Sequence, residues 1–377
     1  MKLCFVLIGI LLNSIGLSQD SINQKNKKQN FIISGGFGYG NVVPTNQFVM
    51  GDNLQNNSID HYKSFSLKAL WQNPGYTHWQ RVHRGPYYGV GISRGDFGNS
   101  YEIGYPVSYY GILGQPVARL QKVDFFTEFQ FGLTNNWKSF DILKNPKNIA
   151  IGGTFTVHLD IALKTFFDLS PKFDFGAGMS FIHFSNGGLK RPNRGFNIFS
   201  PQAEFRYRFV PRPDYKKMEK AENLKRSHDL LFMRTGSVHQ LMEFEPDSNF
   251  FAVYGWSMIY LNQISNAVRL GIGRDMNYWW GMTVNPDGTI GERTIKNLSV
   301  GYILQPEMII GNLTLVGGVG IYAAHSQFGS FKQMYQRLGV RFDIYKTLSL
   351  GVNVRAINFN HAEFMEFNIG YRVRWFK

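Results

Sequence analysis

Residues 365–376 read Met365-Glu366-Phe367-Asn368-Ile369-Gly370-Tyr371-Arg372-Val373-Arg374-Trp375-Phe376, and this stretch decides the fold. Apolar or aromatic side chains occupy every odd position, whereas polar residues or glycine occupy the even positions as far as Arg374. Successive side chains of a β-strand point to opposite faces, so the stretch predicts a strand with one apolar and one polar face. Its aromatic ending also fits the last strand of an outer-membrane barrel.

The same alternation occurs in at least two other places. In residues 202–209 one face carries Ala203, Phe205, Tyr207 and Phe209, and the other carries Gln202, Glu204, Arg206 and Arg208. Residues 338–344 repeat the pattern. A soluble β-sandwich or propeller is the alternative fold. Such apolar and aromatic rows instead fit lipid outside and a polar lumen inside, so we predict an all-β, antiparallel transmembrane barrel in the outer membrane.

Composition supports this prediction. Aromatic residues make up 16% of the chain, glycines number 40 and charged residues make up 18%, which together favour a lipid-facing barrel over a soluble domain. Residues 1–18 read as a signal peptide, with Lys2 before an apolar run and small residues at Gly16 and Ser18. The single cysteine, Cys4, lies within this segment, so we expect a mature protein without disulfides.

The chain also resembles itself, which predicts an internal duplication. Residues 175–186 pair position by position with residues 350–361, residues 88–96 resemble 270–275, and 205–209 resemble the end of the chain. We therefore expect a catalytic barrel unit at 29–211, a charged linker at 212–227 and a degenerate barrel repeat at 228–377. Continued edge pairing favours one barrel of about 16 strands built from two eight-stranded units. Two tandem eight-stranded barrels are the alternative.

Sixteen strands are expected. The first eight lie near 30–40, 62–72, 86–97, 101–113, 118–134, 151–168, 171–186 and 198–211. The second eight lie near 228–242, 250–262, 266–276, 295–304, 307–323, 331–345, 346–359 and 362–376.

One stretch carries chemistry, namely His183-Phe184-Ser185-Asn186-Gly187-Gly188. Residues two apart on a strand share a face, so His183 is placed to act as the general base that the weakly nucleophilic Ser185 hydroxyl requires. Asn186, Gly187 and Gly188 would supply backbone N–H groups to an oxyanion. This face continues along the apolar, lipid-facing row, which makes sense for a lipid substrate. A purely structural or interfacial histidine is the alternative interpretation.

Residues 183–195 resemble the signature of the PagL-type lipid A 3-O-deacylases, also called the acyloxyacyl hydrolase family. The likeness covers about residues 85–210 and includes Gly104-Tyr105-Pro106 and residues 145–152. It implies an outer-membrane barrel that hydrolyses an ester-linked acyl chain of lipid A, with Ser185 as nucleophile, His183 as base and Asn186 beside the oxyanion. The family's acidic third residue, twelve positions after the serine, is replaced here by Asn197.

We therefore expect a serine esterase in the outer membrane whose catalytic residues are His183, Ser185 and Asn197, needing no cofactor or metal. Its partner would be lipid A or lipopolysaccharide, whose phosphates suit the net charge of +14, whereas an exported chain seldom meets nucleic acid. In the second half, Asn358 and Asn360 stand where His183 and Ser185 stand in the first. The rival interpretation is a non-enzymatic barrel, a channel or structural protein that retains a relic motif.

Overall fold

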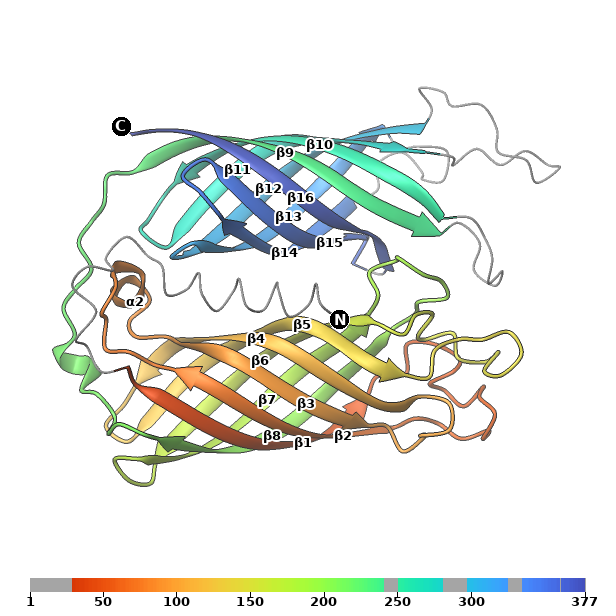
Figure 1. Cartoon of the computed structure of the whole chain (residues 1–377), viewed down its shortest axis with the longest axis horizontal. Coiled ribbons are helices and arrows are strands. Elements are labelled where there is room, and N and C mark those ends of the chain that lie inside the picture. The colour runs from red at the N-terminus through yellow and green to blue at the C-terminus, as the bar shows by residue number, and fades with distance from the viewer. Residues whose placement is uncertain (1–28, 241–249, 281–296, 325–333, 360, 377) are drawn as a thin grey trace. The chain divides into compact units, whose positions relative to one another are not determined.

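The computed structural model describes residues 29–240, 250–280, 297–324, 334–359 and 361–376. The expected signal peptide lies outside these residues. The first eight strands form a closed antiparallel barrel, in which β1 pairs with both β2 and β8 (Figure 1). We call it the first barrel. Its strands are β1 (Phe31–Val42), β2 (His61–Trp71), β3 (Tyr87–Asp96), β4 (Gly104–Arg119), β5 (Val123–Trp137), β6 (Thr156–Asp168), β7 (Phe173–Ser185) and β8 (Phe196–Arg208).

The next eight strands close on themselves in the same way, because β9 pairs with both β10 and β16. We call this the second barrel. Its strands are β9 (Ser227–Gln240), β10 (Phe250–Gln263), β11 (Val268–Trp279), β12 (Leu298–Ile310), β13 (Leu313–Ala324), β14 (Met334–Asp343), β15 (Leu348–Ile357) and β16 (His361–Phe376). The preferred prediction of one 16-stranded barrel is therefore wrong, and the alternative of two eight-stranded barrels is confirmed. Pairing of β8 with β1 leaves neither strand an edge on which the second half could continue.

β4 and β12 extend further than predicted, and each runs through a proline. β4 continues through Pro116 to Arg119, and the register shifts between Pro116 and Ala118. A bulge at this point accommodates a residue that has no N–H to give to the ladder. β12 likewise runs through Pro306 rather than ending before it.

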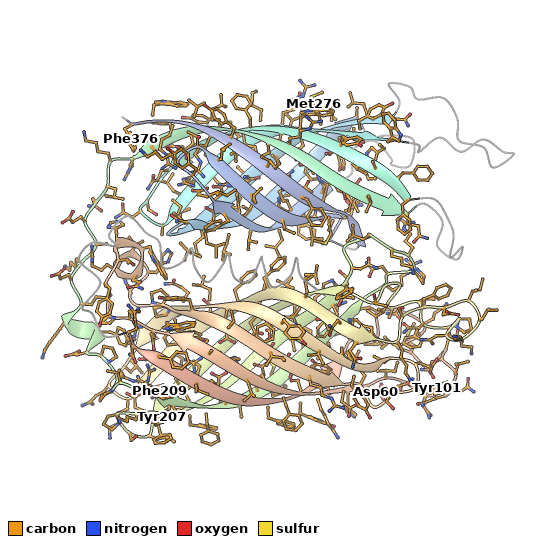
Figure 2. The ribbon with its side chains drawn as sticks, viewed as in Figure 1. Asp60, Tyr101, Tyr207, Phe209, Met276 and Phe376 are labelled. Carbon is orange, nitrogen blue, oxygen red and sulfur yellow. The ribbon has the colours of Figure 1, made fainter. Side chains whose placement is uncertain are left out.

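Side chains on the two faces of each barrel differ as the alternation predicts. Phe205 and Ile369 are more than 60% exposed on the outside, and Figure 2 shows Tyr207 and Phe209 projecting outward from the first barrel. The inward-facing Glu204 and Glu366 are buried. No helix in the described part of the chain is long and apolar enough to cross a membrane.

Ion pairs fill the interior of both barrels. In the first, Lys68 lies 3.0 Å from Glu128 and 2.9 Å from Glu204. In the second, Arg337 and Arg355 each lie 2.7 Å from Glu366. An eight-stranded barrel is just wide enough for side chains to fill its interior, and these charged groups do so. This packing argues against a channel.

The stretches that resemble each other fall on strands of the same rank in the two barrels. Residues 88–96 lie in β3 and 270–275 in β11, the third strand of each barrel, and the longest repeat joins the seventh strands, β7 and β15. The similar endings are the eighth strands, β8 and β16.

The linker is only partly solvated, because its first residues bind the end of the first barrel. Arg212 forms ion pairs with Asp124 at 3.0 Å, with Asp174 at 2.7 Å and with Asp168. The ring of Tyr215, in the short helix η2 (Tyr215–Lys217), lies 4.3 Å from the guanidinium of Arg119. Near the same end, the helix α2 (His78–Val82) lies in the connection between β2 and β3.

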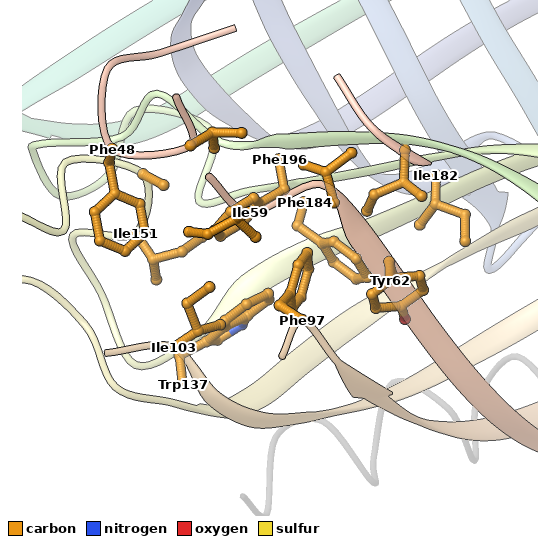
Figure 3. Close-up of a cluster of buried hydrophobic side chains, with 14 residues drawn as sticks. Phe48, Ile59, Tyr62, Phe97, Ile103, Trp137, Ile151, Ile182, Phe184 and Phe196 are labelled. Atoms are coloured by element: carbon orange, nitrogen blue, oxygen red, sulfur yellow. The ribbon is translucent and has the colours of Figure 1, made fainter. Parts of the chain in front are cut away.

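The opposite end of the first barrel carries its two longest connections, after β1 and β5, and an apolar cluster that closes it (Figure 3). Ring centres of Phe97 and Phe196 lie 4.5 Å apart, and those of Trp137 and Phe184 lie 5.3 Å apart. Long loops mark the extracellular end of an outer-membrane barrel and short turns the periplasmic end. We call this extracellular cluster the loop plug; its buried members are Val42, Phe48, Val49, Ile59, Tyr62, Phe97, Ile103, Trp137, Ala150, Ile151, Ile182, Phe184, Phe196 and Ile198.

Candidate active site

Hydrogen bonds connect His183, Ser185 and Asn197 at the extracellular end of β7 and β8. Nδ1 of His183 lies 2.7 Å from Oδ1 of Asn197, and Nε2 lies 3.0 Å from Oγ of Ser185. An amide oxygen can only accept, so the imidazole carries its proton on Nδ1 and donates it to Asn197. Nε2 is then the acceptor for the Ser185 hydroxyl. This is the geometry of a nucleophile, its base and a residue that orients the base.

Strand pairing and the loop plug together fix this arrangement. His183 on β7 stands directly opposite Asn197 on β8. Phe184 and Phe196, the neighbours of these two residues, point inward and are fully buried in the loop plug (Figure 3). Alternation then directs His183, Ser185 and Asn197 outward, on the face where Met179 is 49% exposed. The site therefore faces the lipid side of the wall.

Glu204 is the nearest acidic residue after Asn197 in the sequence, and it does not reach the site. It faces the barrel interior, where it binds Lys68 at 2.9 Å and Arg206 at 2.7 Å. Its charge is therefore balanced by cations of the barrel interior, on the opposite face of β8 from Asn197.

The turn after Ser185 differs in one respect from the expectation for an oxyanion site. The backbone N–H of Asn186 donates to Oδ1 of Asn193 at 2.9 Å, so this donor is already engaged and is not presented to a substrate. Gly187 and Gly188 follow with φ values of +65° and +82°, a left-handed conformation that glycine adopts at little cost. The chain thus turns sharply directly after the nucleophile.

Gly195 is a close neighbour of the site whose role was missed in the sequence. Its φ is +72°, and a Cβ atom placed there would lie 2.7 Å from the carbonyl oxygen of Phe184 and 3.4 Å from Cε1 of His183. Its N–H donates to the carbonyl of Ala150 at 2.9 Å, and its own carbonyl accepts from the side chain of Asn46 at 3.2 Å.

The segment 145–152, which carries part of the family resemblance, is therefore a support for the site. Asn148 holds it by donating to the carbonyls of Glu102 at 3.0 Å and Lys138 at 2.8 Å. The sequence around Asn46 does not indicate its role, because Asn46 lies 149 residues before Gly195 and contacts it only in the folded chain.

In the second barrel, asparagines occupy the positions that correspond to His183 and Ser185. Asn358 follows the last residue of β15, has a φ of +50° and accepts the N–H of Met334 at 3.2 Å. Asn360 lies outside the described residues. The side-chain amide of Asn358 therefore binds the neighbouring backbone.

Comparison with known proteins agrees with the resemblance in both halves. Residues 63–207 match the family described as lipid A 3-O-deacylase (PagL), and residues 228–375 match the family described as the acyloxyacyl hydrolase C-terminal domain. No functionally curated protein matches the chain.

Solved structures with a similar arrangement include Neisserial surface protein A, at 11% identity and a TM-score of 0.32, over 48% of this chain and 97% of that one. Another is the outer membrane protein Omp33 of Acinetobacter baumannii, at 8% identity and a TM-score of 0.17, over 92% of this chain and 98% of that one. These scores are too low to carry an argument about function. The two family matches cover most of the chain between them, and the protein belongs to the PagL family of lipid A deacylases, integral β-barrel proteins of the outer membrane.

Proposed function

We propose that the first barrel is a serine esterase that hydrolyses an ester-linked acyl chain of lipid A. The observation that carries this proposal is the chain of hydrogen bonds from Asn197 through His183 to Ser185. In this reaction Oγ of Ser185 attacks the ester carbonyl while Nε2 of His183 takes the hydroxyl proton. The imidazolium then protonates the departing sugar oxygen, and a water molecule activated by the same imidazole releases the fatty acid.

The location of the site agrees with a lipid substrate. His183 and Ser185 share the outward face of β7 with Met179 and Phe181, so an acyl chain in the membrane would lie along this wall. For the developing oxyanion we propose the turn at Gly187 and Gly188. The N–H of Asn186 is excluded from this role by its bond to Asn193, which instead fixes the shape of the turn.

An asparagine in third position has a definite chemical consequence. The Oδ1 atom of Asn197 holds the imidazole in the tautomer that the mechanism requires, but it brings no negative charge to stabilise the imidazolium. We therefore propose that Asn197 is an orienting residue, and that catalysis depends more on the oxyanion turn than it would with an acid in this position.

Substitution of Asn197 tests this role in two directions. Asn197→Ala removes one neutral hydrogen bond to His183, worth about 1 kcal/mol, so we expect kcat to fall roughly 5-fold. Asn197→Glu adds a charge beside the imidazolium, and we expect kcat to rise roughly 10-fold, far less than the ~10⁴ separating acid from amide in the Ser-His-Asp template. Initial rates of fatty acid release measure both. Full activity of Asn197→Ala would remove the residue from the mechanism.

The second barrel supplies a matched control. Replacing Asn358 and Asn360 by alanine should leave the rate within a few-fold of that of the native protein, because neither aligned position carries a base or a nucleophile. The same assay measures it. A loss as large as that caused by Ser185→Ala would show that the second barrel takes part in the chemistry.

The direct experiment is to incubate the purified full chain with lipopolysaccharide in detergent and to identify the released fatty acid by mass spectrometry. The proposal expects one hydroxylated acyl chain to be released. Absence of any release by correctly folded protein would favour the rival function, a structural barrel that retains the motif.

A further inference from the structure

A polar cleft lies on the extracellular rim of the first barrel, and its lining includes none of the three hydrogen-bonded residues His183, Ser185 and Asn197. Its cavity of about 330 Å³ lies within the usual size range of small-molecule sites. Tyr39, Lys63 and Asp96 stand opposite one another in register across β1, β2 and β3. Asn57 and Asp60, from the connection between β1 and β2, also line the cavity. We call this the rim cleft, and Figure 2 marks Asp60.

Strand register places the rim cleft close to the candidate site. A continuous row of paired backbone runs from Ile182 on β7 through Ile198 on β8 and Val42 on β1 to Asp60. His183 follows Ile182, and Asn197 precedes Ile198. Neighbouring strands lie about 4.8 Å apart, so Asp60 is roughly 10 Å from Asn197 and about 14 Å from His183 around the wall. One glycolipid head group of more than one sugar can reach both places.

The side chains of the rim cleft suit a sugar. The ring of Tyr39 stacks on His61 with 5.4 Å between ring centres, and it remains 43% exposed, so that its exposed surface can take the C–H face of a pyranose. Asp60 and Asp96 accept hydrogen bonds from hydroxyls, while Asn57 and Lys63 donate to them. Asp60 already accepts from Ser58 at 2.6 Å and Asp96 from the N–H of Gly98 at 2.9 Å. Two carboxylate oxygens offer about four acceptor sites, so each retains capacity.

The charges of the rim cleft exclude two other parts of a glycolipid. Two carboxylates stand against one ammonium group among the lining residues, so a phosphate would be repelled. An acyl chain would leave these polar groups without hydrogen-bond partners, which is costly.

We propose that the rim cleft binds a sugar of the lipid A head group while the acyl ester lies at Ser185. This inference rests on the proposed function, and it assigns recognition of the glycan to β1, β2 and β3. Tyr39 and Asp96 then determine how tightly the substrate binds and leave the chemical step to the residues of β7 and β8.

Two variants and one control test the assignment in the full chain. Tyr39→Ala and Asp96→Asn should each raise KM for lipopolysaccharide in detergent by about 5- to 10-fold and change kcat less than 2-fold. Phe65→Ala is the control, because Phe65 is an outward-facing, 66% exposed residue of β2 that does not line the rim cleft. An unchanged KM in both variants, or an equal rise in the control, would overturn the assignment.

A binding experiment separates this inference from the proposed function. Fully deacylated lipopolysaccharide is titrated by calorimetry into the native chain and into the Tyr39→Ala variant, each with and without EDTA. It should bind the native chain 5- to 10-fold more tightly than the variant. If the deacylated probe binds as expected but intact lipopolysaccharide releases no fatty acid, the rim cleft stands and the esterase is refuted. If intact lipopolysaccharide releases fatty acid but the probe binds equally to both proteins, the esterase stands and the rim cleft is refuted. Binding that EDTA abolishes would contradict direct contact, since a cation between Asp60 and Asp96 would then be the ligand.

Discussion

Replacing Ser185 by alanine should lower the rate of fatty acid release from lipopolysaccharide by at least about 10³-fold. The hydroxyl whose Oγ lies 3.0 Å from Nε2 of His183 is the group that attacks the ester carbonyl in the proposed reaction. In serine hydrolases, removal of the nucleophile abolishes the acyl-enzyme route, and the residual rate comes from binding and the oxyanion site alone. Initial rates from purified variant and native protein at saturating substrate measure the effect.

Folding is checked separately for this variant. The loop plug and the interior ion pairs of the first barrel do not include Ser185, so the variant should keep the heat-modifiable gel migration of a closed barrel. If lipid A is trimmed at the native rate by a folded Ser185→Ala protein, the assignment of the nucleophile is wrong.

Gly195→Ala should lower kcat by about 10²-fold, although it replaces none of the reacting groups. The new Cβ would lie 2.7 Å from the backbone oxygen of Phe184 and 3.4 Å from Cε1 of His183. The left-handed φ of +72° adds about 1–2 kcal/mol of strain for a residue with a side chain. Relief of both must move the backbone between His183 and Ser185, and a displacement of about 1 Å in a catalytic group can cost 10²-fold.

Gly111→Ala is the matched control for Gly195→Ala. Gly111 lies in β4 of the same barrel, and a Cβ there would meet only the carbonyl oxygen of Phe131, at the ordinary distance of 3.8 Å. We expect native activity and native thermal stability of the barrel from this variant, measured by the temperature at which its gel migration changes. Equal losses of activity in the two variants would show that Gly195 has no special relation to the site.

Alternation in the sequence was sufficient to predict the strands and the face to which each side chain points. Rows such as the one containing Phe205 and Phe209 fix which face meets lipid, and the two-residue spacing of His183 and Ser185 fixes their common face. Alternation alone could not predict that His183 and Asn197 are cross-strand neighbours, because this depends on the register of β7 against β8. The family resemblance indicated Asn197 as the partner of His183, because it lies at the position of the family's third catalytic residue.

Closure of the barrels could not be predicted from alternation, because strands of one 16-stranded barrel and of two smaller barrels have the same pattern. Only the pairing of β1 with β8 decides between them. The supports of the site were missed for a related reason. Asn46 and Ala150 meet Gly195 through contacts between distant loops, which leave no periodicity in the sequence.

The mass of lipid A from cells that express the protein tests the central claim most directly. Lipid A from cells with the native chain should be lighter by one hydroxyacyl chain than lipid A from cells with equal amounts of the Ser185→Ala variant in the outer membrane. Identical masses in the two samples, with both proteins folded and inserted, would contradict the assignment of an acyl hydrolase to the first barrel.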